Sequence, residues 1–180
     1  MQMTKVLKET QVTPKEIYAA VKPAVTRNKK KYTKSETLDR VYLNIAGEIS
    51  QLSKCNRKKV GAIIVKNDNI LSFGYNGTPM GLCNDCEKDG VTKWQVLHAE
   101  SNAISKVAKT TQSSQGSTLY CTLSPCDECS KLIIQAGITR VVYLEVYDKT
   151  TKGIDLMISS GINVEKYSEH TTLNKTHTLT

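Results

Sequence analysis

The apolar residues of the chain recur with two different periods, and these periods predict alternating helices and strands. From Ser35, a good N-cap, they return every three or four positions over about four turns, which is typical of an amphipathic helix. This apolar stripe consists of Leu38, Val41, Tyr42, Ile45, Ile49 and Leu52. Three further helices are expected at residues 98–109, 126–136 and 154–159, the last two with a glycine shortly after them.

Runs of β-branched and apolar residues predict five strands between these helices. Residues 60–65 and 70–75 flank the turn signal Asn67-Asp68-Asn69, a pattern that indicates a strand, a tight turn and a second strand. Three more strands are expected at residues 118–122, 140–144 and 163–167. A stretch with several glycines and a proline, through about residue 93, is expected to form a long irregular loop.

The order of these elements, α-β-β-α-β-α-β-α-β, predicts an α/β fold. Helices that alternate with strands pack on both faces of a sheet, so we expect a three-layer α/β/α domain with a mixed five-stranded sheet. The domain is expected over residues 35–170. An N-terminal extension, residues 1–34, would precede it, and a threonine-rich tail, residues 171–180, would follow it.

The N-terminal extension carries almost all of the net charge of +8. Residues 1–34 hold nine Lys/Arg and two Glu, whereas residues 35–180 are nearly neutral. A helix start is indicated at residues 13–16, where a threonine, a proline and a glutamate follow the usual pattern, and the helix would be short because Pro23 follows. We expect a solvated, poorly ordered extension, with a specific contact to a subunit or nucleic acid as the alternative. The neutral domain argues against a general polyanion-binding surface.

The composition indicates a soluble protein. Hydrophobic residues make up 39% and charged residues 23% of the chain, and no apolar run approaches the length of a membrane span. Its first ten residues are too polar for a signal peptide. We therefore expect no membrane partner and a cytoplasmic location, in the host cytoplasm if the chain is phage-encoded. The six cysteines are then expected to be thiols or metal ligands rather than a disulfide framework.

A C-x-x-C motif and a nearby H-x-E motif are the main candidates for chemistry. Cys126 and Cys129 are placed where a strand runs into a helix, and a helix N-terminus stabilises the charge of thiolates. Two thiols at this spacing can bind one metal ion or form a redox pair. His98 and Glu100 lie two residues apart at the start of another helix, and a redox pair would give them no role.

Together these motifs predict a catalytic metal centre. His98, Cys126 and Cys129 are three ligands suited to Zn²⁺, and three protein ligands leave a fourth position open. Glu100 is then placed to take a proton from a water molecule at that position. The combination of H-x-E with P-C-x-x-C is a known signature of zinc nucleobase deaminases. Taken singly, the motifs have simpler explanations: a polar residue at a helix start, or half of a structural zinc site.

Longer segments around these residues match a known family. They are Ser53-Lys54 with Val60-Gly61-Ala62, GYNGTPMG at 74–81, HAESNAI at 98–104, TLSPCDEC at 122–129 and LIIQAGITRVVYLEVYDK at 132–149. On these residues the chain resembles the cytidine and deoxycytidylate deaminase superfamily, and within it the phage and bacterial deoxycytidylate (dCMP) deaminases. The resemblance spans about residues 36–168 and implies a cytidine-deaminase-like fold. HAE and PCxxC indicate the reaction, whereas GYNG-x-P-x-G and the IIQAGI segment favour dCMP as substrate.

The resemblance implies hydrolytic deamination of dCMP to dUMP and ammonia, in the synthesis of pyrimidine deoxynucleotides that leads to dTTP. It makes His98, Cys126 and Cys129 the zinc ligands and Glu100 the catalytic acid and base. Glu100 would move protons from the attacking water to N3 of cytosine and then to the leaving ammonia.

The same resemblance implies the substrate contacts. The backbone at Ala99 and Ser124 would hold the pyrimidine edge, and Asn76 would contact the sugar hydroxyl. Lys54 and Tyr147 are candidates for the phosphate region, with a surface lysine and a core aromatic residue as the alternatives.

Three further properties follow from the resemblance alone. Relatives are homohexamers activated by dCTP and inhibited by dTTP, with Mg²⁺ accompanying the triphosphate. Some also hold a second, structural zinc, for which Cys55, Cys83 and Cys86 could supply three ligands here. Its fourth ligand is open, with Asp85, Glu87 or water as candidates, and the site could be absent. Cys121, within a strand, is expected to be a small buried apolar residue.

Two other functions compete with dCMP deamination. A tRNA adenosine deaminase or polynucleotide cytosine deaminase could use the basic extension to bind nucleic acid, but the nearly neutral domain argues against this partner. A non-catalytic zinc-binding regulatory module could keep the fold. Glu100 argues against that module, because binding zinc without proton transfer requires no carboxylate beside the open position.

Overall fold

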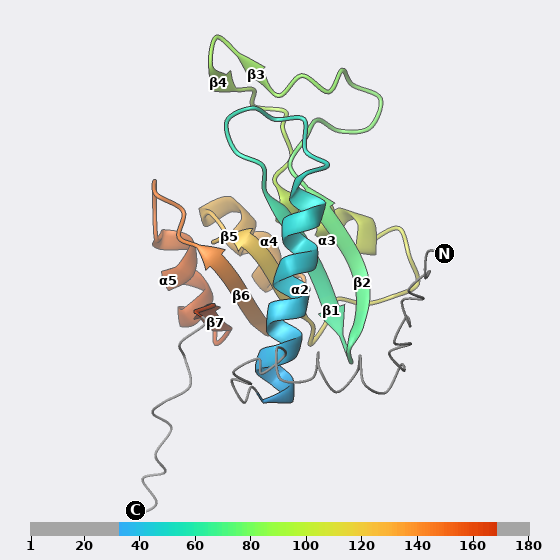
Figure 1. Ribbon diagram of the computed structural model, residues 1–180, viewed down its shortest axis with the longest axis vertical. Coiled ribbons are helices and arrows are strands. Elements are labelled where there is room, and N and C mark those ends of the chain that lie inside the picture. Colours follow the sequence, from blue (N-terminus) through green and yellow to red (C-terminus); the bar gives the residue numbers. More distant parts are fainter. Residues whose placement is uncertain (1–32, 169–180) are drawn as a thin grey trace, which may run out of the picture. The chain divides into compact units, whose positions relative to one another are not determined.

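The predicted mixed sheet is present, with the strand order β2-β1-β5-β6-β7 (Figure 1). The computed structural model describes residues 33–168. Its elements are α2 (Lys34–Ser50), β1 (Gly61–Lys66), β2 (Asn69–Tyr75), β3 (Glu87–Lys88), β4 (Val91–Thr92), α3 (Ala99–Val107), β5 (Thr118–Leu123), α4 (Asp127–Gln135), β6 (Arg140–Glu145), α5 (Lys152–Ser159) and β7 (Asn163–Lys166). This order confirms the predicted alternation of helices and strands. The short helix expected to start at residues 13–16, most of the N-terminal extension and the C-terminal tail lie outside the described residues.

The direction of the strands changes within the sheet. β1 runs antiparallel to both β2 and β5, whereas β5, β6 and β7 run parallel to one another. The β1–β2 hairpin closes through Asn67 and Asp68, whose φ angles are 51° and 60°. Positive φ at both central residues defines a tight turn that matches the twist of the strands, and asparagine and aspartate tolerate it well. The turn was therefore predictable from its residue types.

Alternate side chains of β1 face two separate cores, which gives the domain its three layers. Ile63 and Val65 pack with α2 on one face of the sheet. Ala62 and Ile64 pack on the other face, in a core built with residues of α3, α4 and α5. A strand buried on both faces reads as a continuous apolar run, as this one does. Cys121 is fully buried in the second core, as predicted.

The loop between β2 and α3 contains a small hairpin that the sequence pattern did not indicate. Residues through about 93 were expected to be irregular, but β3 and β4 pair there as a two-stranded sheet. The turn uses Asp89 and Gly90, whose φ angles are 52° and 74°. An Asp-Gly pair favours this turn, but the flanking strands have two residues each and give no visible alternation.

In the described part of the chain, every helix is too short or too polar to cross a membrane.

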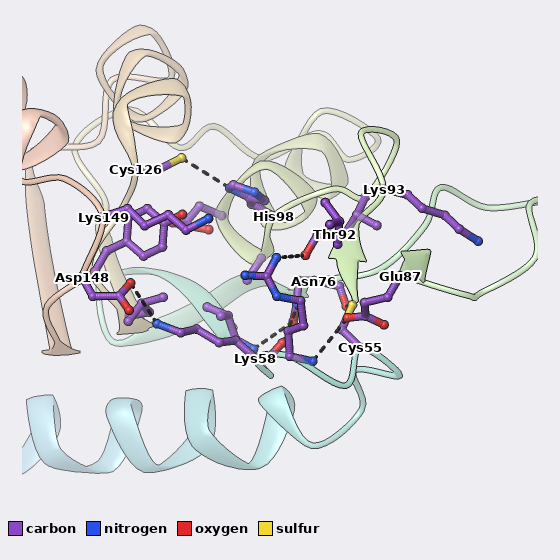
Figure 2. A pocket seen from close by; sticks show the side chains of 18 of the residues that line it. Cys55, Lys58, Asn76, Glu87, Thr92, Lys93, His98, Cys126, Asp148 and Lys149 are labelled. Atoms are coloured by element: carbon purple, nitrogen blue, oxygen red, sulfur yellow. Dashed lines mark hydrogen bonds and ion pairs between the residues drawn. The ribbon is translucent and has the colours of Figure 1, made fainter. Parts of the chain in front are cut away.

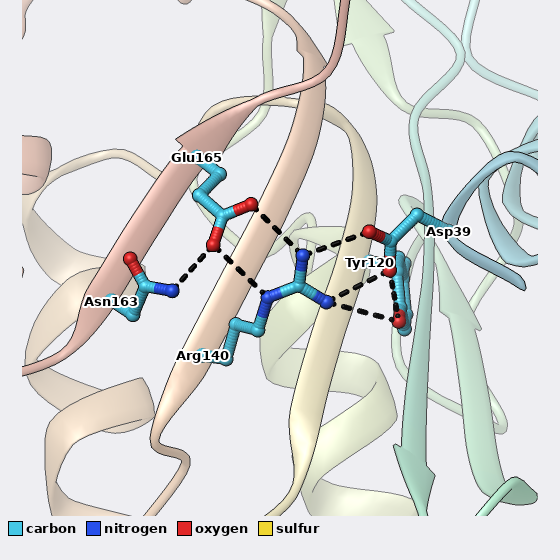
Figure 3. Close-up of polar contacts among 5 residues, drawn as sticks. All are labelled: Asp39, Tyr120, Arg140, Asn163 and Glu165. Atoms are coloured by element: carbon cyan, nitrogen blue, oxygen red, sulfur yellow. Dashed lines mark hydrogen bonds and ion pairs between the residues drawn. The ribbon is translucent and has the colours of Figure 1, made fainter. Parts of the chain in front are cut away.

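An ion cluster joins three strands and a helix at the edge of the sheet where β5, β6 and β7 begin (Figure 3). Arg140 donates to both carboxylate oxygens of Asp39 at 2.8 Å and pairs with Glu165 at 2.9 Å. Tyr120 donates its hydroxyl to Asp39, and Asn163 donates to Glu165. Burial raises the pKa of Asp39, but the hydrogen bonds from Arg140 and Tyr120 outweigh burial and the net pKa is lowered. Arg140 also lowers the pKa of Glu165.

We expect Arg140→Leu to lower the free energy of unfolding by about 3 kcal/mol, because it leaves Asp39 buried without its cation. Since the pKa values of both carboxyl groups are lowered, their stabilisation is present above the ordinary carboxyl range and is lost as pH falls through the lowered values. The stability difference between the two proteins should therefore shrink in acid. Urea unfolding at neutral and acid pH measures both effects. The control, Lys34→Ala, removes an exposed pair with Asp68 and should change stability by less than about 1 kcal/mol.

Candidate active site

Two helix N-termini bring the predicted metal ligands together. His98 is the N-cap of α3, and Cys126 is the N-cap of α4. Cys129 follows in the first turn of α4. The Nδ1 atom of His98 lies 3.4 Å from the Sγ atoms of both cysteines. Within residues 33–168, these three side chains are the one group of potential metal ligands whose ligand atoms lie within 4.8 Å of one another.

A glycine and an asparagine place the start of α3 against β2. A Cβ atom on Gly74 would lie 2.0 Å from the backbone oxygen of Ala99, so only glycine permits this approach. Asn102 donates a side-chain hydrogen bond of 2.9 Å to the backbone oxygen of Tyr75. These contacts fix the helix that carries His98 and Glu100.

The donor set fits a zinc ion. Zn–S bonds of about 2.3 Å and Zn–N bonds of about 2.0 Å in a tetrahedron separate the nitrogen and sulfur ligands by about 3.5 Å. The separations of 3.4 Å observed between His98 and the two cysteines are close to this value. One imidazole and two thiols are also a known ligand set for catalytic zinc. Three protein ligands leave the fourth coordination position for water.

The two thiols have opposite protonation preferences when no metal is bound. Hydrogen bonds from Cys129 and His98 lower the pKa of Cys126 to about 4. The hydrogen bond to Cys126 and burial raise the pKa of Cys129. The hydrogen bond with Cys126 also raises the pKa of His98. The site thus stabilises negative charge on the sulfur of Cys126.

Glu100 is a buried carboxyl group beside this centre. It lies in the first turn of α3, two residues after His98, and is 4% exposed. Burial raises its pKa above the usual range for a glutamate. A carboxyl group with a raised pKa can accept and return a proton near neutral pH.

A cavity of about 420 Å³ opens beside the metal-ligand group (Figure 2). Its wall includes Glu100 and four of the five predicted substrate contacts, which are Asn76, Ala99, Ser124 and Tyr147. Lys54, the fifth, is exposed and is not part of this wall. Figure 2 shows His98 and Cys126 on one side of the cavity and Lys58 and Glu87 on the opposite side.

Two of these predicted contacts also build the wall. The side chain of Asn76 accepts a hydrogen bond from the N–H of Val60 and donates one to the backbone oxygen of Lys58, both at 2.8 Å. Ser124 accepts a hydrogen bond of 2.8 Å from the N–H of Tyr147. These bonds fix the loops that frame the cavity.

Four cations that sequence reasoning missed also line the cavity: Arg57, Lys58, Lys93 and Lys149. Lys58 pairs with Asp148 at 3.2 Å, and Lys93 pairs with an aspartate at 2.6 Å. Among the residues that the structure describes, the side chains of Arg57 and Lys149 form no ion pair with a carboxylate. The only local signal was the basic character of residues 54–59, which does not show which side chain faces the cavity.

Of the three cysteines offered for a second zinc, the structure brings two together. Cys55 and Cys86 form a disulfide, whereas Cys83 is an exposed free thiol. A structural zinc site needs four protein ligands, and these residues do not supply them in the structure.

The comparisons with known proteins agree with this geometry. The family model of the cytidine and deoxycytidylate deaminase zinc-binding region matches residues 36–145. The deoxycytidylate deaminase of Enterobacteria phage T4 is 36% identical over 165 residues, which cover 68% of this chain and 86% of the phage protein. The deoxycytidylate deaminase of Homo sapiens is 37% identical over 139 residues, which cover 70% of this chain and 77% of the human protein.

A solved structure resembles the whole described domain. The dCMP deaminase of cyanophage S-TIM5, crystallised in complex with dCMP and dUMP, is 48% identical with a TM-score of 0.72. The match covers 76% of this chain and 100% of the cyanophage chain. The fold predicted from the sequence is therefore confirmed. The chain belongs to the zinc-binding cytidine and deoxycytidylate deaminase family.

Proposed function

We propose that this protein hydrolyses dCMP to dUMP and ammonia. The observation that carries the proposal is the convergence of His98, Cys126, Cys129 and buried Glu100 on one cavity. The relatives named deoxycytidylate deaminase, and the cyanophage enzyme with bound dCMP and dUMP, support the choice of substrate. A cavity of about 420 Å³ also lies within the range of about 300–1,000 Å³ that is typical of small-molecule sites.

In this mechanism Glu100 is the residue that moves protons. When bound by His98, Cys126 and Cys129, zinc supplies the Lewis acid that makes water nucleophilic at neutral pH. Glu100 accepts one proton from the attacking water and passes it to N3 of cytosine, while the water oxygen bonds to C4. It then takes the second proton of that oxygen and gives it to the amino group, so that the C4–N bond breaks, C4=O forms and ammonia leaves. Its raised pKa suits both directions of transfer. Walls fixed by hydrogen bonds orient the base in this step.

The phosphate of dCMP is assigned to the two cavity cations whose side chains form no ion pair in the described structure, Arg57 and Lys149. A planar guanidinium recognises phosphate through two parallel hydrogen bonds. Lys58 is already neutralised by Asp148 and attracts a phosphate less strongly. The backbone at Ala99 and Ser124 would hold the pyrimidine edge.

Regulation and assembly follow the family pattern in our proposal. We expect a homohexamer that dCTP activates and dTTP inhibits, with Mg²⁺ accompanying the triphosphate. The reaction supplies dUMP as a precursor of dTTP in the cytoplasm of the cell that makes the protein.

A substrate comparison tests the proposal. We expect release of ammonia from dCMP, a KM for deoxycytidine that is higher by at least about tenfold because it lacks the phosphate, and no deamination of single-stranded DNA or tRNA. Formation of dUMP is followed by the change in ultraviolet absorbance. Activity on DNA or tRNA without activity on dCMP would overturn the proposal in favour of a polynucleotide deaminase. Adding dCTP and dTTP to the same assay tests the regulation.

A further inference from the structure

Arg57, one of the two cations assigned to the substrate phosphate, lies on a segment without regular secondary structure. This segment joins α2 to β1 and spans residues 51–60. Arg57 donates a hydrogen bond of 2.9 Å from Nη1 to the hydroxyl of Thr92 on β4. Its side chain is exposed, so its position in the cavity depends on what holds the segment.

The β3–β4 hairpin holds this segment through Glu87. One carboxylate oxygen of Glu87 accepts the N–H groups of Asn56 at 3.1 Å and of Arg57 at 3.3 Å. A carboxylate forms strong hydrogen bonds with backbone N–H groups. Glu87 therefore fixes the backbone from which the Arg57 side chain departs.

The Cys55–Cys86 disulfide makes the same connection covalently. It joins the residues that directly precede Asn56 and Glu87, and both cysteines are buried. The hydroxyl of Ser53 accepts the N–H of Cys55 at 3.2 Å and donates to the backbone oxygen of Asn76 at 2.8 Å. The disulfide thus ties the hairpin to the segment and to the end of β2.

The residues present favour a disulfide over a metal ion at this place. A structural zinc needs four ligands, and the thiol that could have been the third, Cys83, is exposed and free. The group of three or more metal-ligand side chains in residues 33–168 is the catalytic one, and it does not include Cys55 or Cys86.

We propose that the Cys55–Cys86 disulfide takes the place of a second structural zinc and, with Glu87, forms a redox-sensitive clamp that positions Arg57 for the phosphate of the substrate. The part of this inference that concerns phosphate rests on the proposed function. Opening the clamp lets the segment move away from the hairpin, and binding of dCMP then requires that it be ordered again. Affinity for the phosphate falls as a result, whereas the groups around Glu100 keep their places.

The opening step is a two-electron reduction. A phosphine reductant such as TCEP breaks the S–S bond, two protons are taken up, and Cys55 and Cys86 become thiols. The phosphine is oxidised to the phosphine oxide with the oxygen of one water molecule. A phosphine is preferred over a dithiol in the experiment because thiols also bind zinc.

Counting thiols and zinc tests the clamp without any activity measurement. The chain has six cysteines, so the protein purified without reductant and unfolded with a chelator should show four thiols, and six after reduction. The folded protein should hold one zinc per chain. The control, Cys83→Ala, should lose one thiol and keep its zinc. Six thiols before reduction, or two zinc ions per chain, would overturn the clamp.

Kinetics then test the positioning of Arg57. Reduction should raise the KM for dCMP by about tenfold, toward the value of Arg57→Ala, while kcat stays within about twofold. The KM for deoxycytidine, which has no phosphate, should not change. Glu87→Ala should raise the KM for dCMP, and Glu87→Gln, which keeps an acceptor oxygen, should restore it. Reduction needs no mutation, so the test stands even if a double cysteine variant does not fold.

These measurements separate the clamp from the proposed function. If the protein turns over dCMP and reduction leaves its KM unchanged, the clamp is wrong and the function stands. If the protein does not turn over dCMP, the proposed function fails, and the thiol and zinc counts still decide whether the disulfide replaces the metal.

Discussion

Replacing Glu100 with glutamine is expected to leave the zinc content of the protein unchanged and to lower kcat for dCMP by about 10²–10⁴-fold or more. The reason is that glutamine has the shape of glutamate but does not carry a proton from water to the base. Glu100 is 4% exposed and its pKa is raised by burial, so a neutral side chain at this place should fold at least as well. The measurements are kcat at saturating dCMP, zinc per chain and urea unfolding.

Glu145→Gln is the matched control for this change. Glu145 ends β6, is exposed and does not line the cavity, so its variant should keep kcat. Unchanged turnover in Glu100→Gln would contradict the assigned mechanism and would favour a zinc-binding module with another role. Loss of zinc in the same variant would instead show that Glu100 supports the metal site.

The grouping of the candidate metal ligands could be predicted because these residues belong to short local patterns. Cys126 and Cys129 occupy the first turn of one helix, and His98 and Glu100 occupy the first turn of another. Helix start signals and the order of the strands then place the first turns of both helices near each other, at one edge of the sheet. The fold was predictable for a similar reason, since β1 is an apolar run that packs on both faces.

The cations of the cavity could not be predicted in the same way. Lys54 and Arg57 are three residues apart on one irregular segment, and only Arg57 lines the cavity. The direction of Arg57 depends on Glu87 and Thr92, which are at least 30 residues away in the chain. Sequence periodicity carries no information about such contacts, because it describes neighbours on one helix or strand.

The disulfide was not predicted, because the cysteines of a chain without a secretory signal are expected to be thiols or metal ligands. The resemblance offers Cys55, Cys83 and Cys86 as ligands of a second zinc and leaves open whether that site exists. The disulfide joins two residues 31 positions apart, one in the segment after α2 and one directly before the β3–β4 hairpin. The sequence contains the Asp-Gly signal, but its two flanking strands are too short to be recognised.

Replacing Cys129 with alanine is expected to remove both zinc and activity. Two protein ligands remain after this change, and they do not form the three-ligand site that holds zinc with one position open for water. A metal that acts as a Lewis acid contributes several kcal/mol to the transition state, so kcat should fall by about 10³-fold or more. Zinc per chain after dialysis against a chelator, together with kcat, measures the effect.

Cys121→Ala separates this effect from the loss of a buried cysteine. Cys121 is as buried as Cys129 and packs in the same core, but it does not belong to the metal-ligand group. Its variant should keep zinc and kcat and lose only a little stability, because alanine removes one sulfur atom from an apolar site. Zinc binding and full activity in Cys129→Ala would contradict the three-ligand centre. Loss of both in Cys121→Ala as well would show that the cysteines act through folding. Both residues are buried cysteines, so the expected contrast between their variants would show that zinc binding and activity depend on where the cysteine lies and not on the loss of a buried thiol.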